Sequence, residues 1–333
     1  MLDVYIIAKN TVVKRHVDSA AQFRHALFTA DAKIVVEELI THVGGGAVNT
    51  ASALQTFGLQ VAAVYAVGCD QSAARINSFL ATKGVDLRFV QQLQDLPSGL
   101  SYIVVDQGGE HLIFAAKLAS TQLALTHIPW PQLADSNFIY VTSLEQQALA
   151  VVLPVLQFAR ERNIAVVVNP GCGMLAQGAG ILCDNLASIT LLQLNSSEAH
   201  LLALALKSAD GCLANGQLQI KRFLALLLQA GVQIVVITDG CHGAYAAADK
   251  HGYFIPSATT TVVDAVGAGD AFGAIFAANV LAGKSIPDAL RLAVIASSAT
   301  IKQLGACAGH LSATALQQQL ACANVLPVVE FEL

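Results

Sequence analysis

The sequence predicts an α/β protein with a mainly parallel sheet covered by helices on both faces, and a second, smaller sheet. Strand-like runs alternate with helical stretches through most of the 333 residues, and the connections between them are short. Two stretches, residues 11–43 and 98–118, break this alternation with strand-like runs of their own. The hydrophobic content of 55% is typical of buried parallel strands and the helices that cover them.

The strands of the main sheet are expected at four runs and its helices at two longer stretches. The strands are Asn137–Thr142, Ile164–Asn169, Ser188–Leu194 and Gln233–Thr238, and the helices are Glu145–Arg162 and Gln217–Ala230. Polar or glycine-containing segments, NPG, LNSSE and TDGCHG, follow three of these strands. Because ligands bind beyond the carboxyl ends of parallel strands, we expect the site at that edge of the sheet.

The smaller sheet is expected to pair segments that are far apart in the sequence. Ala32–Glu38 is the clearest strand of its first stretch. In the second stretch, Leu100–Asp106 and His111–Lys117 flank Gln107-Gly108-Gly109, which is typical of a β-hairpin.

Composition argues against several classes of protein. No apolar run approaches the ~18 residues of a membrane helix, and the N-terminus lacks a signal-peptide pattern, so we expect a cytoplasmic protein. The seven cysteines form no C-x-x-C pair and the nine histidines no H-x-x-x-H pair, so neither a disulfide framework nor a zinc site is expected. A net charge of −5 makes nucleic acid and anionic membranes poor partners.

The most informative stretch, TTTVVDAVGAGDAFGAIFAANVLAG, lies near the C-terminal end. Its β-branched run Thr259–Val263 predicts a strand, and Ala271–Leu281 is apolar and small enough for a buried helix. Between them, Gly267-Ala268-Gly269 predicts a tight turn whose N–H groups could hold an anion. Asp270 would repel a phosphate, but it could take a proton from an attacking hydroxyl while the amides stabilise a transferring phosphoryl group. Alternatively, the small residues only permit close packing and Asp270 merely begins the helix.

A second motif, GGGAVNTASALQTFGLQVAAVYAVGCD, spans Gly44 to Asp70. Its three glycines permit backbone bending or close approach to a ligand, and Asn49 follows in the first turn of a predicted helix. A flexible loop that ends in a helix cap would give the same pattern.

The two motifs, in this order at opposite ends of the chain, resemble the signatures of the ribokinase-like (PfkB) family of sugar and nucleoside kinases. DAVGAGDAF is close to that family's D-T-x-G-A-G-D-x-F, with Ala265 in place of the usual Thr. The other motif is similar to G-G-x-x-x-N-x-A followed by L-G and V-G-x-D. The resemblance covers the chain from about Leu2 to Ala315.

The resemblance implies a single ribokinase-like domain over residues 1–333, with a three-layer α/β/α core, a mainly parallel sheet and a small β-sheet lid. The lid would come from residues 11–43 and 98–118; in the family it covers the substrate and often forms the contact of a homodimer. Gly45 and Gly46 would form the hinge between lid and core, and Asn49 would touch substrate hydroxyls.

The resemblance also implies ATP-dependent transfer of the γ-phosphoryl group to a primary hydroxyl of a small sugar or nucleoside. Asp270 would be the general base, and the amides of Val266, Gly267, Ala268, Gly269 and Asp270 would hold the developing charge. A rival interpretation is a catalytically silent sensor of sugars or nucleosides on the same fold. An NAD-dependent oxidoreductase is disfavoured because IIAKNTVV stands where G-x-G-x-x-G would follow the first strand.

Two further motifs bear on ATP. Asn195 and Glu198 share one face of a helix if it starts at Asn195, and could hold water molecules around Mg²⁺. Their spacing alone favours a capping box, whereas the family's N-x-x-E implies support of Mg–ATP. Thr238, Gly240 and Gly243 taken alone predict only a turn, and their similarity to the family's T-x-G-x-x-G implies contact with ATP.

Some members of the family bind K⁺ beside the anion site. By resemblance, Asp264 and Val266 would be ligands of such a monovalent cation, although Asp264 could equally be a carboxylate of the helix turn. The stretch Gln303–His310 resembles the loop that closes the adenine pocket and completes the cation site. His242 and His310 lie near these loops and are interpreted as incidental.

The N-terminal segment departs from the family pattern. Family members have a first strand that ends in Gly and then an Asp that clasps substrate hydroxyls, whereas here Val13 stands at the expected position after the strand Val4–Ile7. Asp18 is the next carboxylate in this segment and is displaced by several residues. A lost charged hydrogen bond costs on the order of 1.5–3 kcal/mol, so either the substrate differs from a ribose-like diol or another group substitutes.

Basic residues near the predicted lid bear on whether the substrate already carries a phosphate. A sugar phosphate would need a basic clamp. The candidates, which are equally consistent with solvated side chains, are Lys9, Lys14, Arg15 and Lys117. The sequence therefore favours an unphosphorylated acceptor.

Overall fold

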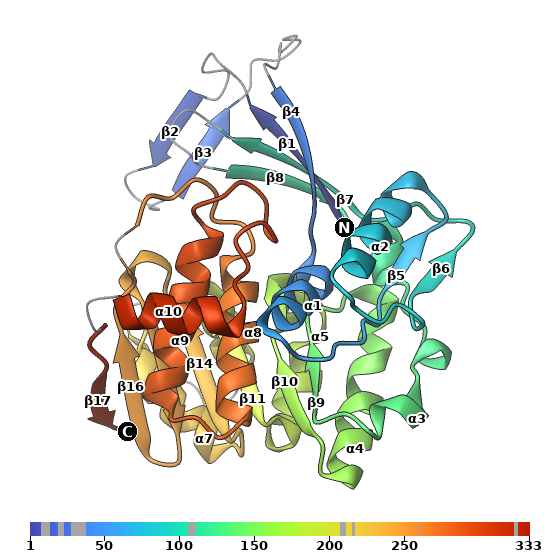
Figure 1. Ribbon diagram of the computed structural model, residues 1–333. Coiled ribbons are helices and arrows are strands. Elements are labelled where there is room, and N and C mark those ends of the chain that lie inside the picture. The colour runs from blue at the N-terminus through green and yellow to red at the C-terminus, as the bar shows by residue number, and fades with distance from the viewer. Residues whose placement is uncertain are drawn as a thin grey trace.

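A seven-stranded sheet with the order β17-β16-β15-β14-β11-β10-β9 forms the centre of the molecule (Figure 1). The computed structural model describes residues 1–7, 14–18, 23–27, 38–105, 111–206, 211–214, 217–258, 260–322 and 326–333. The strands are β9 (Phe138–Val141), β10 (Ala165–Val168), β11 (Leu191–Asn195), β14 (Ile234–Thr238), β15 (Ala244–Ala248), β16 (His251–Ile255) and β17 (Val329–Glu332). The strands from β9 to β14 are parallel, as predicted, and the three beyond β14 are antiparallel.

Helices cover both faces of this sheet, because successive side chains of a strand point to opposite sides. Val166 and Val168 belong to a core with α4, α5, α6 and α7, whereas Val167 belongs to a core with α8 and α9. The helices are α1 (Gly46–Phe57), α2 (Gln71–Thr82), α3 (Trp130–Leu133), α4 (Val152–Arg162), α5 (Gly171–Cys183), α6 (Ser196–Ala205), α7 (Ile220–Gln229), α8 (Ala268–Leu281), α9 (Ile286–Thr300) and α10 (Ala313–Cys322). The three-layer α/β/α architecture is therefore confirmed.

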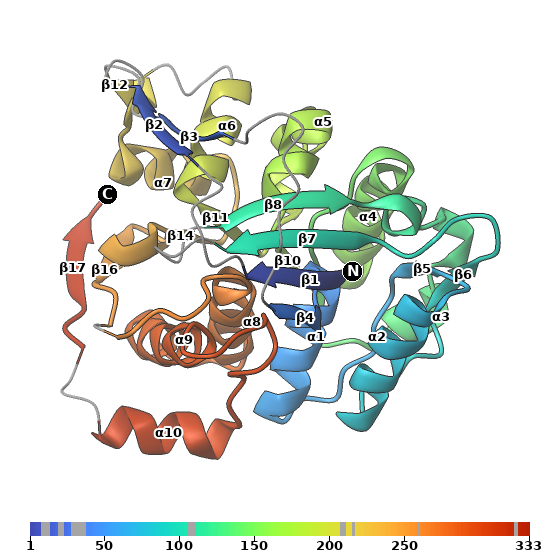
Figure 2. The same ribbon diagram turned by 90° about the horizontal axis from the view of Figure 1, so that it is seen from above.

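A four-stranded sheet, here called the small sheet, lies across one end of the core (Figures 1 and 2). Its order is β4-β1-β7-β8, from β4 (Glu38–Val43), β1 (Leu2–Ile7), β7 (Leu100–Val105) and β8 (His111–Ala116). The predicted hairpin is confirmed, since β7 and β8 pair antiparallel. The first strand of the chain therefore pairs within the small sheet, parallel to β7, and not within the main sheet.

Shorter pairs of strands complete the description. Antiparallel pairs join β2 (Lys14–Asp18) to β3 (Phe23–Leu27) and β12 (Leu213–Ala214) to β13 (Gln217–Leu218). A parallel pair joins β5 (Ala66–Gly68) to β6 (Gln91–Leu93). Of the strand expected at residues 32–38, only Glu38 is described, and it begins β4.

Three predicted elements differ from the structure. The strand expected at Thr259–Val263 is wrong for residues 260–263, which run as irregular backbone with exposed valines and pair with no strand that the structure describes. Residue 259 lies outside the described part. The helix expected at Glu145–Arg162 begins as a 3₁₀ helix, which runs from Gln146 to Val151. The α-helix α4 follows, with Pro154 in its first turn, where proline is tolerated. The stretch from Gln217 begins with β13 before α7 starts at Ile220.

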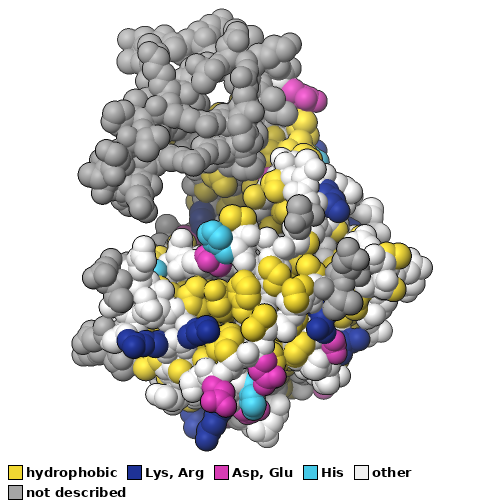
Figure 3. Space-filling view, turned by 90° about the vertical axis from the view of Figure 1, so that its left-hand side faces the viewer, with side chains coloured by type: hydrophobic (Ala, Val, Ile, Leu, Met, Phe, Trp, Pro, Cys, Tyr) yellow, Lys and Arg dark blue, Asp and Glu magenta, His cyan; other side chains and the backbone are white. Residues whose placement is uncertain are grey.

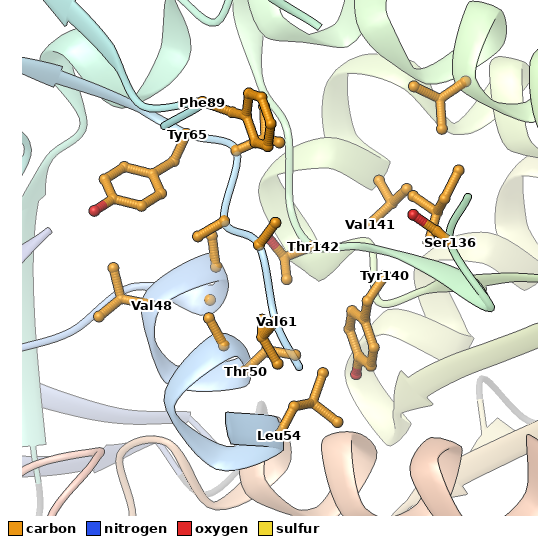
Figure 4. Close-up of a pocket in the computed structure, with 18 of the residues that line it drawn as sticks. Val48, Thr50, Leu54, Val61, Tyr65, Phe89, Ser136, Tyr140, Val141 and Thr142 are labelled. Atoms are coloured by element: carbon orange, nitrogen blue, oxygen red, sulfur yellow. The ribbon is translucent and has the colours of Figure 1, made fainter. Parts of the chain in front are cut away.

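A cavity of about 980 Å³ separates β9 from the segment 58–66 (Figure 4). Val48, Leu54 and Val61 line one side, and Tyr140 and Val141 of β9 line the other. Since β9 is the last strand of the main sheet, its outer edge faces this cavity.

Some of the hydrophobic side chains are exposed at the surface. Seen from the side of β17, apolar side chains gather across the middle of the surface (Figure 3). Val262, Val263 and Val329 are among the exposed apolar residues of the chain. No helix in the described ranges is long and apolar enough to cross a membrane.

Replacement of Phe276 by alanine tests the packing of α8 on the sheet. Phe276 is fully buried in the core that joins α8 to the main sheet, so Phe276→Ala should lower the free energy of unfolding by about 3–5 kcal/mol. Urea unfolding measures this. The control, Leu204→Ala, changes a side chain that is 61% exposed and should cost less than about 0.5 kcal/mol. A loss below that of the control would contradict this packing.

Candidate active site

The glycine turn before α8 has the geometry that the sequence predicts for a ligand-binding turn. Gly267 caps α8 with a φ of 80°, and a Cβ there would lie 2.5 Å from the Cβ of Ala306, so only glycine fits. Gly269 is exposed, with nothing within 4 Å of the position of a Cβ. A ligand can therefore approach the backbone directly at Gly269.

The backbone amides of this turn divide into two groups. The N–H of Val266 donates to Asp264 Oδ1 at 3.0 Å, and that of Ala268 to the carbonyl of Ala265 at 3.4 Å. The amides of Gly269 and Asp270 stand in the first turn of α8, where no partner exists within the helix. The helix dipole adds positive potential at the same end, so these amides can bind an anion.

Asp270 lies where two helices begin. Asn49, in the first turn of α1, donates from Nδ2 to Asp270 Oδ2 at 2.8 Å. Burial raises the pKa of Asp270 to about 6, the Asn49 hydrogen bond opposes this effect, and the charges of Glu198 and Asp3 add to it. A carboxylate with a pKa near neutrality is ionised at pH 7 and is a stronger base than an exposed one, which suits a general base.

Asp264 ties three distant segments together. Its fully buried carboxylate accepts hydrogen bonds from the Tyr5 hydroxyl at 2.7 Å and the Gly305 amide at 2.9 Å, in addition to the amide of Val266. Burial and the contact with Asp264 raise the pKa of Tyr5, which therefore stays a hydrogen-bond donor. In the parts of the chain that the structure describes, no cluster of three His, Cys, Asp or Glu side chains could hold a metal ion. A K⁺ role for Asp264 and Val266 stays a prediction.

Gln193 supports the glycine turn and was not found by the sequence analysis. It accepts from the Tyr140 hydroxyl at 2.7 Å and donates from Nε2 to the carbonyl of Gly269 at 2.8 Å. A Cβ on Gly273 would lie 1.5 Å from Gln193 Oε1, so glycine at 273 makes room for this contact. The signal was present, because Gln193 is the one polar residue inside the run LLQL.

The residues expected to contact ATP or its Mg²⁺ ion lie together at the carboxyl ends of neighbouring strands. Asn195 of β11 pairs in register with Thr238 of β14. Asn195 Oδ1 accepts from the amide of Glu198 at 2.9 Å, and Glu198 Oε2 accepts from the amide of Asn195 at 2.9 Å. The capping box that the spacing favoured is therefore present. Both residues still lie where β11 ends and α6 begins, and the charge of Glu198 raises the pKa of Asp270.

The turn after β14 contains two glycines with different roles. Gly243 has a φ of 123°, and a Cβ there would lie 2.1 Å from the carbonyl oxygen of Ile255, so glycine is required for the turn. Gly240 has a φ of 55° with open space around it. Only Gly240 therefore leaves its backbone accessible to a ligand.

Glu198 is the side chain best suited to support a divalent cation. It is buried, and burial raises its pKa. A nearby cation would favour its ionised form. Oxygen ligands and intervening water are what Mg²⁺ prefers, so the pair Asn195 and Glu198 fits this ion.

A carboxylate that the sequence analysis overlooked lies beside Gly44, the residue before the predicted hinge glycines Gly45 and Gly46. Asp3 of β1 is buried, and a Cβ on Gly44 would lie 1.7 Å from Asp3 Oδ2. Gly45, with a φ of 99°, caps α1 beside Met1. The charge of Asp3 also acts on Asp270, whereas Val13, where a carboxylate was expected, lies outside the described residues. Asp3 could have been noticed as a charged residue within the apolar run LDVYII.

The basic residues considered for a phosphate clamp do not converge on this centre in the described part of the chain. Lys117 forms an ion pair with Glu145, and both line the large cavity rather than the glycine turn. Lys9 lies outside the described residues, and only the backbone is described for Lys14 and Arg15. The cavity reaches Gly45 and Gly46 but none of the residues 264–270, so it is not the candidate catalytic centre.

The chain matches the profile of the pfkB family carbohydrate kinases over residues 16–313, and it belongs to that family. The ribokinase of Haemophilus influenzae is 26% identical over 266 residues, which are 79% of this chain and 82% of that protein. The chain spans about half the length of the bifunctional relatives it also matches.

Two solved structures show the same fold. A putative ribokinase II from E. coli, in complex with ATP and Mg²⁺, has a TM-score of 0.76 at 16% identity, with 97% of each chain covered. A nucleoside kinase of Burkholderia thailandensis, in complex with inosine, has a TM-score of 0.73 at 17% identity, with 98% of this chain and 97% of that chain covered. The ribokinase-like fold expected from the sequence is therefore confirmed.

The raised pKa of Asp270 predicts how stability depends on pH. The pKa of an Asp in an unfolded chain is near 3.9, whereas that of Asp270 in the folded protein is about 6. Between about pH 4 and 6, the folded protein therefore holds the Asp270 proton more tightly than the unfolded chain does. Ionisation of Asp270 therefore lowers stability over this range. Asp270→Asn removes the effect and should be more stabilising at pH 7 than at pH 4, by roughly 1–3 kcal/mol. Urea unfolding of both proteins at the two pH values checks this, and a constant difference would contradict it.

Proposed function

We propose that this protein is an ATP-dependent kinase that phosphorylates a primary hydroxyl of a small sugar or nucleoside. The observation that carries the proposal is the position of Asp270, a carboxylate with a raised pKa at the amide-rich start of α8. The accessible backbone at Gly269 lies beside it. A base adjacent to an anion-binding turn is what phosphoryl transfer to a hydroxyl requires.

In this proposal Asp270 takes the proton of the acceptor hydroxyl, and the turn amides stabilise the transferring group. The amides of Gly267, Gly269 and Asp270 supply most of this stabilisation, because those of Val266 and Ala268 are already engaged. Positioning and charge neutralisation are the main contributions to phosphoryl transfer. The hydrogen bond from Gln193 to the carbonyl of Gly269 positions the turn and so supports this stabilising role of its amides.

The nucleotide is proposed to bind along the ends of β11 and β14. Thr238, Gly240 and Gly243 form the turn beside which its phosphates or ribose would lie. Asn195 and Glu198 would hold hydrated Mg²⁺. When bound, this ion neutralises phosphate charge.

The acceptor is proposed to lie between Asp270 and the hinge glycines Gly45 and Gly46. Asn49 keeps a second amide hydrogen for a substrate hydroxyl, and Asp3 supplies the carboxylate that was sought near Val13. Asp3 thereby weakens the case for a silent sensor, which rested on the lack of that carboxylate. A ribose-like group, free or within a nucleoside, is consistent with both the ribokinase relative and the inosine-bound structural neighbour.

The small sheet is proposed to act as the lid of a single kinase domain and as the surface of a homodimer. It joins α1 through Gly44–Gly46, and closure there would exclude water from the transfer step. Three apolar side chains that the strand register places on one face of this sheet are between 44% and 62% exposed: Leu39, Tyr102 and Phe114. An exposed apolar face of this kind fits a second copy of the chain.

An ADP-release assay tests the activity. Mg–ATP is offered with ribose, fructose, 2-keto-3-deoxygluconate, adenosine, other nucleosides and hexose phosphates, with and without K⁺. One unphosphorylated acceptor should respond strongly. Asp270→Ala should bind ATP as the wild type does and lose nearly all turnover, because no base remains. Turnover within tenfold of the wild type would rule out the general-base role, and silence with every acceptor would favour the sensor.

Asp3→Asn tests the acceptor site separately. Loss of a charged hydrogen bond of about 1.5–3 kcal/mol should raise the KM of the acceptor by at least tenfold and leave the KM of ATP unchanged. Ser101→Ala is the matched control, since Ser101 bonds to Asp3 and Met1 within the small sheet. Equal effects of both variants on the two KM values would show that Asp3 only supports the sheet.

A further inference from the structure

A buried cysteine is linked to the candidate base by two hydrogen bonds that meet at the Asn49 side chain. Cys307 follows Gly305 and Ala306 in the loop after α9, and its Sγ is 3.2 Å from Asn49 Oδ1. Asn49 in turn donates from Nδ2 to Asp270 Oδ2 at 2.8 Å. Both ends of the Asn49 amide are therefore engaged, one by the thiol and the other by the base.

The direction of these bonds follows from protonation. Burial raises the pKa of Cys307 to about 12, so at neutral pH the group is a thiol and donates its hydrogen to Asn49 Oδ1. An amide oxygen that accepts from the thiol must have its NH₂ group on the other side. That side faces Asp270, so the thiol fixes the orientation in which Asn49 donates to the carboxylate.

The chain of donors extends beyond the cysteine. Ser52 hydrogen-bonds to Cys307, and its Oγ lies 3.0 Å from His310 Nδ1. Burial lowers the pKa of His310 to about 4, so its ring is neutral, and Ser52 and the backbone of Ala306 are its hydrogen-bond partners. From Ser52 through Cys307 and Asn49, each bond points its hydrogen towards Asp270.

We propose that Cys307 is a positioning residue for Asp270: its thiol holds the Asn49 amide in the orientation that donates to the base. The inference rests on the proposed role of Asp270 as general base. Ser52 and His310 hold the thiol in turn. Without the thiol, the Asn49 amide can turn its oxygen towards the carboxylate, which disfavours the ionised form that accepts the proton.

Other charges also act on this pair. Glu198 of α6 and Asp3 of β1 raise the pKa of Asp270 and are unchanged by substitution of the cysteine. Lys83, at the end of α2, acts on Cys307 and His310. A change in the titration of Asp270 on removal of the thiol therefore reports on Asn49.

The test compares Cys307→Ala with Cys307→Ser, two side chains of nearly equal volume of which only serine can donate. The alanine variant should shift the acidic limb of the kcat–pH profile upwards by about one unit. This shift lowers kcat about fivefold at pH 6 and less than twofold at pH 8. The serine variant should keep a profile close to that of the wild type, and the KM of ATP should not change in either.

Cys212→Ala is the control for loss of a buried thiol. Cys212 is buried in the core of the opposite face and is bonded to neither Asn49 nor Asp270. Its replacement should lower the melting temperature without moving the pH profile. Equal profiles for the alanine and serine variants at position 307 would overturn the proposal, as would a loss of kcat that is the same at pH 6 and pH 8.

A second measurement separates this proposal from the proposed function. The carboxyl carbon of Asp270, labelled with ¹³C and assigned by its loss in Asp270→Asn, is titrated by NMR in the wild type and both position-307 variants. Its pKa should rise by about one unit in Cys307→Ala and stay near the wild-type value in Cys307→Ser. This result would hold even if the enzyme assay found no acceptor. An unchanged pKa in the alanine variant would refute the positioning role whatever the activity.

Discussion

The hydrogen bond between Asn49 and Asp270 is the contact on which the rest of the site depends. It joins the first turns of α1 and α8, two helices that pack through Ala53, Leu54, Ala274 and Ala278. Small side chains at this interface let the helix axes approach closely, so the two N-termini point at one place. The positive ends of both helices and the base therefore act on the same small volume.

Asp264 extends this constraint to the small sheet. Through Tyr5 it fixes β1, and through Gly305 it fixes the loop that carries Cys307. The buried carboxylate thus aligns three segments that the chain brings together from positions 5, 264 and 305. Movement of β1 away from the turn would break the hydrogen bond between Tyr5 and Asp264, so the position of the small sheet is coupled to the geometry of the turn.

The elements that depend on local sequence patterns were predicted correctly, whereas features that depend on contacts between distant residues were missed. The parallel strands and the turn at Gly267–Gly269 followed from apolar runs and from glycine chemistry. Residues 260–263 were predicted as a strand because they are β-branched, but none of the described strands pairs with them. Cys307 carried no local signal of function, since it meets Asn49 across 258 positions in the sequence.

The charges of the site bear on whether the proposed nucleotide would bind with or without a divalent cation. Asp3, Glu198 and Asp270 are acidic, the charges of Asp3 and Glu198 act on Asp270, and burial raises the pKa of each. A polyphosphate adds more negative charge to this centre, and the amides of α8 offset only about half an elementary charge. The repulsion that remains favours a nucleotide that arrives with its own divalent cation, whose charge also keeps Glu198 ionised. In the proposed reaction, this cation would bind near Glu198 and leave Asp270, held by Asn49, to receive the proton.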